Sequence, residues 1–303
     1  MLWLVFALCG PVSWAASTHI DKYLVDKYFR DSDTAVLIVF TALIGLIALP
    51  VIWLLDPDVL SLSNLAIGVM TLSGILYMGA ILFYLRAIQS EEASVVAPLF
   101  QLSVLFTLLL GFLLLHETIS LSQFAGMGLI IAGVLASSLH GRSFLRSFKK
   151  RLLALMAAAT FIVSLSSVLF KYFAVAETFW GTTFWTFVGQ ALFGLAILAI
   201  PAYRRQFVAL FRKSPGAVTG INAANELINL GAGLSVRYAS LFAPVALVSA
   251  VSSTTTLFVF GIGMLLTIFF PTLGREDLSH ANAARKGISA LLVTAGVILA
   301  NRM

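Results

Sequence analysis

The 303-residue sequence contains little charge and almost no cysteine. Charged residues make up 11% of the chain, whereas about a quarter of the residues are charged in a soluble globular domain. The single cysteine, Cys9, excludes an intrachain disulfide and a cysteine-based metal cluster. The histidines lack ligand spacing, and no G-x-S-x-G, P-loop or H-E-x-x-H motif is present. These absences argue against a soluble protein and against an enzyme, and we expect no cofactor.

Apolar residues, in contrast, make up 60% of the chain and gather in long runs. A membrane-spanning helix needs about 20 such residues. The runs therefore predict an all-α integral membrane protein with ten transmembrane helices. The expected spans are 2–22, 34–55, 63–86, 93–115, 121–140, 152–174, 180–201, 216–237, 243–270 and 284–301.

The net charge of +6 is concentrated in short loops, which is typical of orientation signals and not of a nucleic-acid surface. The two most basic connections are expected at 141–151 and 203–213. All Lys and Arg residues except Lys171, Arg237 and Arg302 follow odd-numbered spans. Because basic loops stay in the cytoplasm, this distribution favours a topology with both termini outside.

The two halves of the chain share residues at a nearly constant separation. Lys22 recurs 149 residues later as Lys171, and Arg86 recurs 151 residues later as Arg237. A duplicated five-span unit follows, and because five is odd the second copy is expected upside down in the membrane. The shared lysine argues that the first helix is retained and is not a cleaved signal peptide. The expected parts are a first repeat 1–140, a basic loop 141–151 and a second repeat 152–303.

The stretch NAANELINLG, residues 222–231, places polar side chains inside an apolar run. Its four polar residues follow the i, i+3, i+4, i+7 spacing of one helix face; they are Asn222, Asn225, Glu226 and Asn229. A carboxylate deep in a membrane costs a few kcal/mol and usually faces an interior cavity. We expect a cavity-facing stripe in which Glu226 binds substrate or carries a proton. A polar clamp between helices is the alternative.

Three basic side chains are further candidates for the site. Lys171 and Lys22 are expected to face the cavity and pair with Glu226 or an anionic substrate, unless they snorkel to the headgroups. Charged neighbours favour snorkelling for Lys22. His19 lies one turn before Lys22, where it is a candidate proton relay or a structural histidine. The spans at 2–22, 63–86, 152–174 and 216–237 are expected to form the cavity wall.

Two further patterns concern helix packing. Small residues repeat every fourth position at Gly128, Ala132 and Ala136, which predicts a close helix contact within the chain or a dimer face. A run of hydroxyl residues at 252–256 is expected either to hydrogen bond a ligand or to bond its own backbone.

In the segment 90–139, a helix with small residues and proline is followed by a glutamate and a Gly-rich helix. The residues are Ala97, Pro98, Glu117, Gly126, Gly128 and Ala132-Gly133-Val134, repeated in part as Ala243, Pro244, Glu276 and Ala295-Gly296-Val297. In these features the chain resembles EamA-type domains of the drug/metabolite transporter superfamily, with two such repeats. His116 departs from the pattern, because the family usually has glycine before the glutamate.

The resemblance implies ten helices and carrier-type transport of small metabolites across a bacterial inner membrane. It also implies cytoplasmic termini, which the Lys and Arg distribution contradicts. Together with the polar stripe it predicts a secondary active exporter of a small metabolite or amino-acid-like solute, working by alternating access with optional proton coupling. The expected partners are this solute, the bilayer and, as an option, a second copy of the chain. A lipid-linked precursor flippase and a non-transporting membrane subunit stay open as alternatives.

Overall fold

All residues that the computed structural model describes lie in helices or in connections between helices, and none of these residues lies in a strand. The described residues are 2–24, 34–90, 99–100, 102–138, 150–213, 215–269 and 280–300. Apolar sequences of this length satisfy their backbone polar groups in a membrane as helices. The predicted all-α class is therefore confirmed.

The helix bounds follow the predicted spans with two main differences, while residues 93–98 of the expected 93–115 span lie outside the described residues. In chain order the helices are α1 (Leu2–Leu24), α2 (Thr34–Leu55), a 3₁₀ turn η2 (Pro57–Leu60), α3 (Asn64–Ser90), α5 (Leu102–Leu115), α6 (Leu121–Ser138), α7 (Lys150–Ala176), α8 (Phe179–Ala199), α9 (Pro201–Lys213), α10 (Pro215–Ser240), α11 (Val245–Ser252), α12 (Thr255–Phe269) and α13 (His280–Ala300). The differences are α9, which replaces an expected loop, and the division of the expected 243–270 span into α11 and α12.

Six stretches of the described chain are long and apolar enough to cross a membrane. They are Leu2–Asp21, Ile38–Leu55, Asn64–Ala87, Leu152–Ala176, Phe179–Ala199 and Val245–Phe269. Leu102–Leu115, Leu121–Ala136 and Gly287–Ala300 are apolar but shorter. Helix α10 belongs to neither group, because its polar stripe interrupts the apolar sequence. A multi-pass membrane protein is thus supported, and the count of ten spans stays a prediction.

Helix α9 is amphipathic and lies against the ends of α1 and α2. Its Tyr203 and Phe207 pack with the buried Leu24 and Val36, and the ring of Phe207 lies 4.8 Å from that of Phe40. Its basic residues Arg204, Arg205 and Arg212 are exposed, and Arg205 and Arg212 lie on the opposite side of the helix from these apolar contacts. The 203–213 segment was expected as a loop; it is helical because its apolar side chains find a surface to cover.

The expected ninth span is broken between α11 and α12. The hydroxyls of Ser252, Ser253 and Thr254 donate to the carbonyls of Val248, Ala250 and Val251 at 2.6–2.8 Å. Such bonds from side chain to nearby carbonyl bend or interrupt helices. The hydroxyl run therefore bonds its own backbone.

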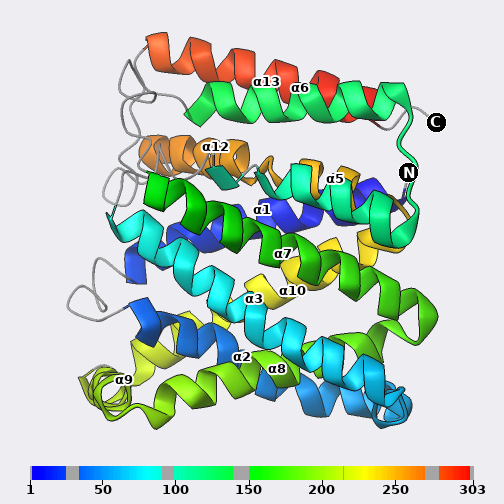
Figure 1. Ribbon diagram of the computed structural model, residues 1–303. Coiled ribbons are helices and arrows are strands. Elements are labelled where there is room, and N and C mark those ends of the chain that lie inside the picture. The colour runs from blue at the N-terminus through cyan, green and yellow to red at the C-terminus, as the bar shows by residue number, and fades with distance from the viewer. Residues whose placement is uncertain are drawn as a thin grey trace.

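The helices pack in successive pairs, which the reader can follow in Figure 1 from one side of the bundle to the other. Helices α6 and α13 pack together on one outer side, and α2 and α8 pack together on the opposite side. Between them α1 packs on α10 and α12, and α7 packs on α3 and α5. Each predicted span has a counterpart five spans later in the chain. If every span is replaced by its counterpart, the same set of helix pairs is obtained.

Glycines permit the closest of these helix contacts. A Cβ at Gly126 of α6 would lie 2.5 Å from the backbone nitrogen of Ala300 and 2.7 Å from the carbonyl of Gly296, both in α13. A Cβ at Gly189 of α8 would collide with the Thr71 carbonyl of α3. The expected stripe through Gly128 is not this contact face, because no atom lies within 4 Å of a Cβ there. The α6 residues that pack against α13 include Gly126 and Gly133 instead.

Candidate functional site

The polar stripe of α10 lies inside the bundle, on the helix face that its spacing predicts. Asn222, Asn225 and Glu226 are buried, with 5%, 0% and 5% of their surface exposed. Asn229 is half-buried. These side chains therefore do not contact lipid, and helices α1 and α2 supply their neighbours.

Glu226 is held on one side only. Its Oε1 accepts a hydrogen bond of 2.8 Å from the Thr41 hydroxyl of α2. Its Oε2 is buried and has no hydrogen-bond partner. The side chain of Asn229 lies next to this carboxylate. One oxygen of Glu226 is thus oriented by the protein, and the other is left for a proton, a water or a solute.

The asparagines connect Glu226 to the end of α1. The Nδ2 of Asn225 donates to the Asp21 carboxylate at 2.6 Å. The Oδ1 of Asn225 and the Nδ2 of Asn222 are buried without partners. The Asp21 side chain is exposed and lies near enough to Glu226 for electrostatic interaction. The two carboxylates and the amides form one polar cluster that reaches from the interior to the surface.

Unpaired polar atoms distinguish this cluster from a simple clamp between helices. Leaving a buried donor or acceptor unsatisfied costs about 1–3 kcal/mol, and native proteins contain few such groups. The cluster has three, on Asn222, Asn225 and Glu226. They comprise one donor and two acceptors, a set that can hold water, a proton or a solute with hydroxyl or ammonium groups.

The structure places His19 and Lys22 apart from this cluster or leaves them undescribed. The Nε2 of His19 lies 2.8 Å from the Val259 carbonyl of α12, so this ring links α1 to α12. The backbone of Lys22 lies in α1, and its side chain lies outside the described residues.

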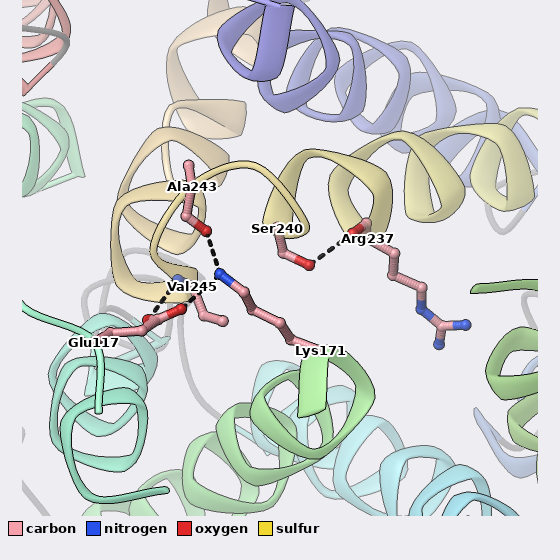
Figure 2. A network of polar contacts seen from close by, with 6 residues as sticks. All are labelled: Glu117, Lys171, Arg237, Ser240, Ala243 and Val245. Atoms are coloured by element: carbon pink, nitrogen blue, oxygen red, sulfur yellow. Dashed lines mark hydrogen bonds and ion pairs between the residues drawn. The ribbon is translucent and has the colours of Figure 1, made fainter. Parts of the chain in front are cut away.

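Lys171 is bound elsewhere, as Figure 2 shows. Its Nζ lies 2.6 Å from Oε1 of Glu117 and donates to the Ala243 carbonyl at 2.8 Å. The expected pairing of Lys171 with Glu226 is thus not found. The lysine is instead a cross-link between α7, the connection from α5 to α6, and the turn before α11.

Glu117 completes this cross-link. Its Oε2 accepts from the backbone N–H of Val245, the first residue of α11, at 2.9 Å. A carboxylate is favourable at a helix N-terminus, where backbone donors lack internal partners. Gly111 leaves room for it, because a Cβ there would lie 2.8 Å from Oε2. Both oxygens of Glu117 are therefore paired.

The residue before Glu117 explains the departure from the family pattern. His116 has φ 53°, in the left-handed region that glycine adopts without steric cost. The Glu117 N–H donates to the Gly111 carbonyl at 3.1 Å, which closes the end of α5 around this residue. The chain therefore keeps the glycine-type turn that places Glu117, with a histidine in it.

Sequence reasoning missed three residues of the site. Thr41 and Asp21 contact the stripe. Thr41 lies in the apolar helix α2 and Asp21 lies near the charged end of α1, and no sequence pattern at either position indicates a binding residue. Arg237 enters the sequence analysis only as a sign of the repeat and of orientation, yet its guanidinium lies inside, over the rings of Phe170 at 4.8 Å and Phe187 at 5.5 Å. A signal was available, because Arg237 follows Glu226 by eleven residues, which returns to the same helix face.

Comparisons with known proteins agree with this architecture. Residues 1–139 match the sequence model of the "EamA-like transporter family". A solved structure described as "Crystal structure of protein" has a TM-score of 0.63 at 16% identity, covering 99% of this chain and 97% of that chain. At this identity the likeness shows the fold alone. No curated protein sequence matches the chain.

Proposed function

We propose that the chain is a secondary active carrier. Its residues 1–139 match the sequence model of the EamA-like transporter family, whose members are membrane transporters of the drug/metabolite type and are generally not enzymes. It exports a small metabolite or amino-acid-like solute across a bacterial inner membrane by alternating access. The polar stripe of α10 binds the solute or the coupling ion, and Glu226 is its central residue.

The pairing of helices supports a carrier built from two inverted repeats. The first repeat comprises α1 to α6 within 1–140, and the second comprises α7 to α13 within 152–303, without the amphipathic α9. The contact of α1 with α10 has its counterpart in that of α7 with α3, and the contact of α5 with α7 has its counterpart in that of α12 with α1. Two units related in this way have two equivalent arrangements, which is the basis of rocking between inward-open and outward-open states.

The observation that carries the proposal is the set of unpaired buried atoms on one face of α10. A clamp that only joined helices would gain free energy by pairing these atoms, or by replacing them with apolar groups. Their retention in a membrane helix is understandable if a solute, water or proton completes them during transport. Thr41 holds one Glu226 oxygen in place, and the exposed Asp21 lies at the surface end of the same cluster.

The first test measures charge movement by the purified protein in proteoliposomes, on addition of panels of amino acids and other metabolites. Wild type is compared with Glu226→Gln. Glu177→Gln is the matched control, because that carboxylate lies at the end of α7 and accepts from the Ser63 hydroxyl outside the cluster. We expect a solute-dependent current that falls at least about tenfold in Glu226→Gln and persists in the control.

Uptake of labelled solutes decides the remaining outcomes. Uptake without current indicates electroneutral exchange and keeps the carrier. A normal current in Glu226→Gln keeps the carrier and makes Glu226 part of a clamp. Absence of both current and uptake across the panels would overturn the proposal and favour a lipid flippase or a non-transporting subunit.

A further inference from the structure

Arg237 lies in the last turn of α10, but its side chain enters the bundle. The guanidinium lies over Phe170 of α7 and Phe187 of α8, at 4.8 Å and 5.5 Å from the ring centroids. It is also close enough to Tyr77 of α3 for electrostatic interaction. Tyr77 and Phe187 lie near the middle of their helices. The charge is therefore in the interior of the bundle and not at the membrane surface.

This interior cation lacks an anionic partner among the described residues. Its Nη1 is buried and has no hydrogen-bond acceptor. The ion pair between Lys171 and Glu117 is complete without it, and Figure 2 shows the Arg237 side chain pointing away from that pair. Aromatic rings interact with the face of a guanidinium, but they leave the N–H donors at its edge unoccupied.

Arg237 shares one face of α10 with Glu226. Eleven residues correspond to three turns and about 20°, and Gly233 lies on this face between the two. No atom lies within 4 Å of a Cβ built at Gly233. On one flank Val236 packs against Gly10 of α1. The face of α10 is therefore not closely packed at this position, between the arginine and the polar stripe.

The other flank of this face is also closed. Leu230 and Leu234 of α10 pack with the apolar cluster that contains Ile52 of α2 and Phe187 of α8. With α1 on one side and α2 and α8 on the other, the face looks towards α3 and α7. These helices supply Tyr77 and Phe170, the aromatic neighbours of Arg237.

We propose that Arg237 binds the carboxylate of the transported solute, and that the rings of Phe170 and Phe187 contact its apolar part. A guanidinium presents two parallel N–H donors that match the two oxygens of a carboxylate. The flanking phenylalanines favour an aromatic or aliphatic group next to that carboxylate. The substrate class is therefore a small organic acid with an apolar side. This inference rests on the carrier function proposed above.

Glu226 and Arg237 lie on different turns of α10, and we assign them different roles. The Cα atoms of Glu226 and Arg237 are about 16 Å apart along the axis, which exceeds the length of an amino acid. Arg237 selects the anionic solute, whereas Glu226, which repels a carboxylate, acts on the coupling proton.

Binding of 3-phenylpropionate to the detergent-purified full chain, measured by isothermal titration calorimetry, tests the proposal. The neutral amide of the same acid controls for apolar contact, and inorganic phosphate tests a different oxyanion. The variants are Arg237→Gln and Arg237→Lys, with Arg204→Gln as the matched control on the exposed side of α9. We expect binding to weaken at least about tenfold in Arg237→Gln, less in Arg237→Lys, and to be unchanged in Arg204→Gln.

Several results would overturn the assignment. They are absence of acid binding to the wild type, equal binding to Arg237→Gln, equal binding of the amide, and a preference for phosphate. If Arg237→Gln does not fold, Arg237→Lys becomes the test, because it keeps the charge but lacks the two parallel donors. Acid binding weaker than in the wild type is then expected, and unchanged acid binding would overturn the assignment.

The outcome is separable from that of the carrier proposal. Glu226-dependent transport of a neutral or cationic solute, without acid binding, would keep the carrier and remove the carboxylate site. Acid binding that depends on Arg237, without transport of any solute, would keep the site and remove the carrier.

Discussion

Within the described residues, two groups of charged side chains lie in the interior of the bundle, and they are built in opposite ways. At the turn before α11, Lys171 and both oxygens of Glu117 have partners at 2.6–2.9 Å. Along α10, atoms of Asn222, Asn225 and Glu226 have none. Both groups lie in the apolar part of the chain, so burial alone does not separate them. The difference lies in whether the protein itself completes the hydrogen bonds.

This comparison separates a structural role from a functional one. A complete network stabilises one arrangement of helices, because breaking any contact leaves a buried group unpaired. An incomplete network stabilises nothing further until another molecule enters. Lys171 therefore holds the connection between the halves, and the α10 stripe is the place for a solute or an ion.

The largest expected effect comes from breaking the complete network. Lys171→Met leaves the Glu117 carboxylate, only 11% exposed, without its counter-charge. We expect a loss of stability of about 3 kcal/mol, measured as a lower unfolding temperature of the purified protein by tryptophan fluorescence. The double variant Glu117→Gln with Lys171→Met regains part of this loss. An unchanged unfolding temperature in Lys171→Met would contradict the structural role.

The opposite pattern is expected in the incomplete network. Asn222→Leu replaces a buried amide whose Nδ2 has no partner with an apolar group of similar volume. We expect stability to be unchanged or slightly higher, and solute transport in proteoliposomes to fall about tenfold, equivalent to about 1.4 kcal/mol. A stability loss with normal transport would identify the stripe as a clamp.

The smallest expected effect concerns the turn that places Glu117. His116→Gly removes the steric cost of a left-handed residue, about 1–2 kcal/mol, but adds the chain entropy that glycine loses on folding, about 0.5–1 kcal/mol. We expect a gain in stability of about 0.5 kcal/mol, seen as a slightly higher unfolding temperature with unchanged transport. A decrease would show that the imidazole makes a contact that outweighs the strain.

The fold was largely predictable, because apolar length and composition decide which segments form membrane helices. The errors have local causes. The 203–213 segment is helical since Tyr203 and Phe207 cover the ends of α1 and α2. The helix breaks at Ser253 and Thr254, whose hydroxyls donate to carbonyls of the preceding turn. The alternative prediction for these residues was that they hydrogen bond a ligand.

The candidate site was predictable only where it lies on one helix. The spacing of Asn222, Asn225 and Glu226 gives their common face directly. Lys171 resembles a cavity residue in sequence, but its partner Glu117 is 54 residues away. Arg237 resembles a residue of the membrane surface, and only the crossing of α3, α7 and α8 brings aromatic rings to it.

The sequence by itself determined that this chain is a polytopic helical membrane protein with a polar stripe on α10, because hydrophobicity and helical period are local properties. Its resemblance to the EamA-type transporters also follows from local motifs, including Pro98, Glu117 and Ala132-Gly133-Val134. The tertiary structure alone decided which charges are paired, since partners on different helices have no fixed separation in sequence. It therefore assigned Lys171 to the framework and left Glu226 and Arg237 as the interior charges without a complete set of partners.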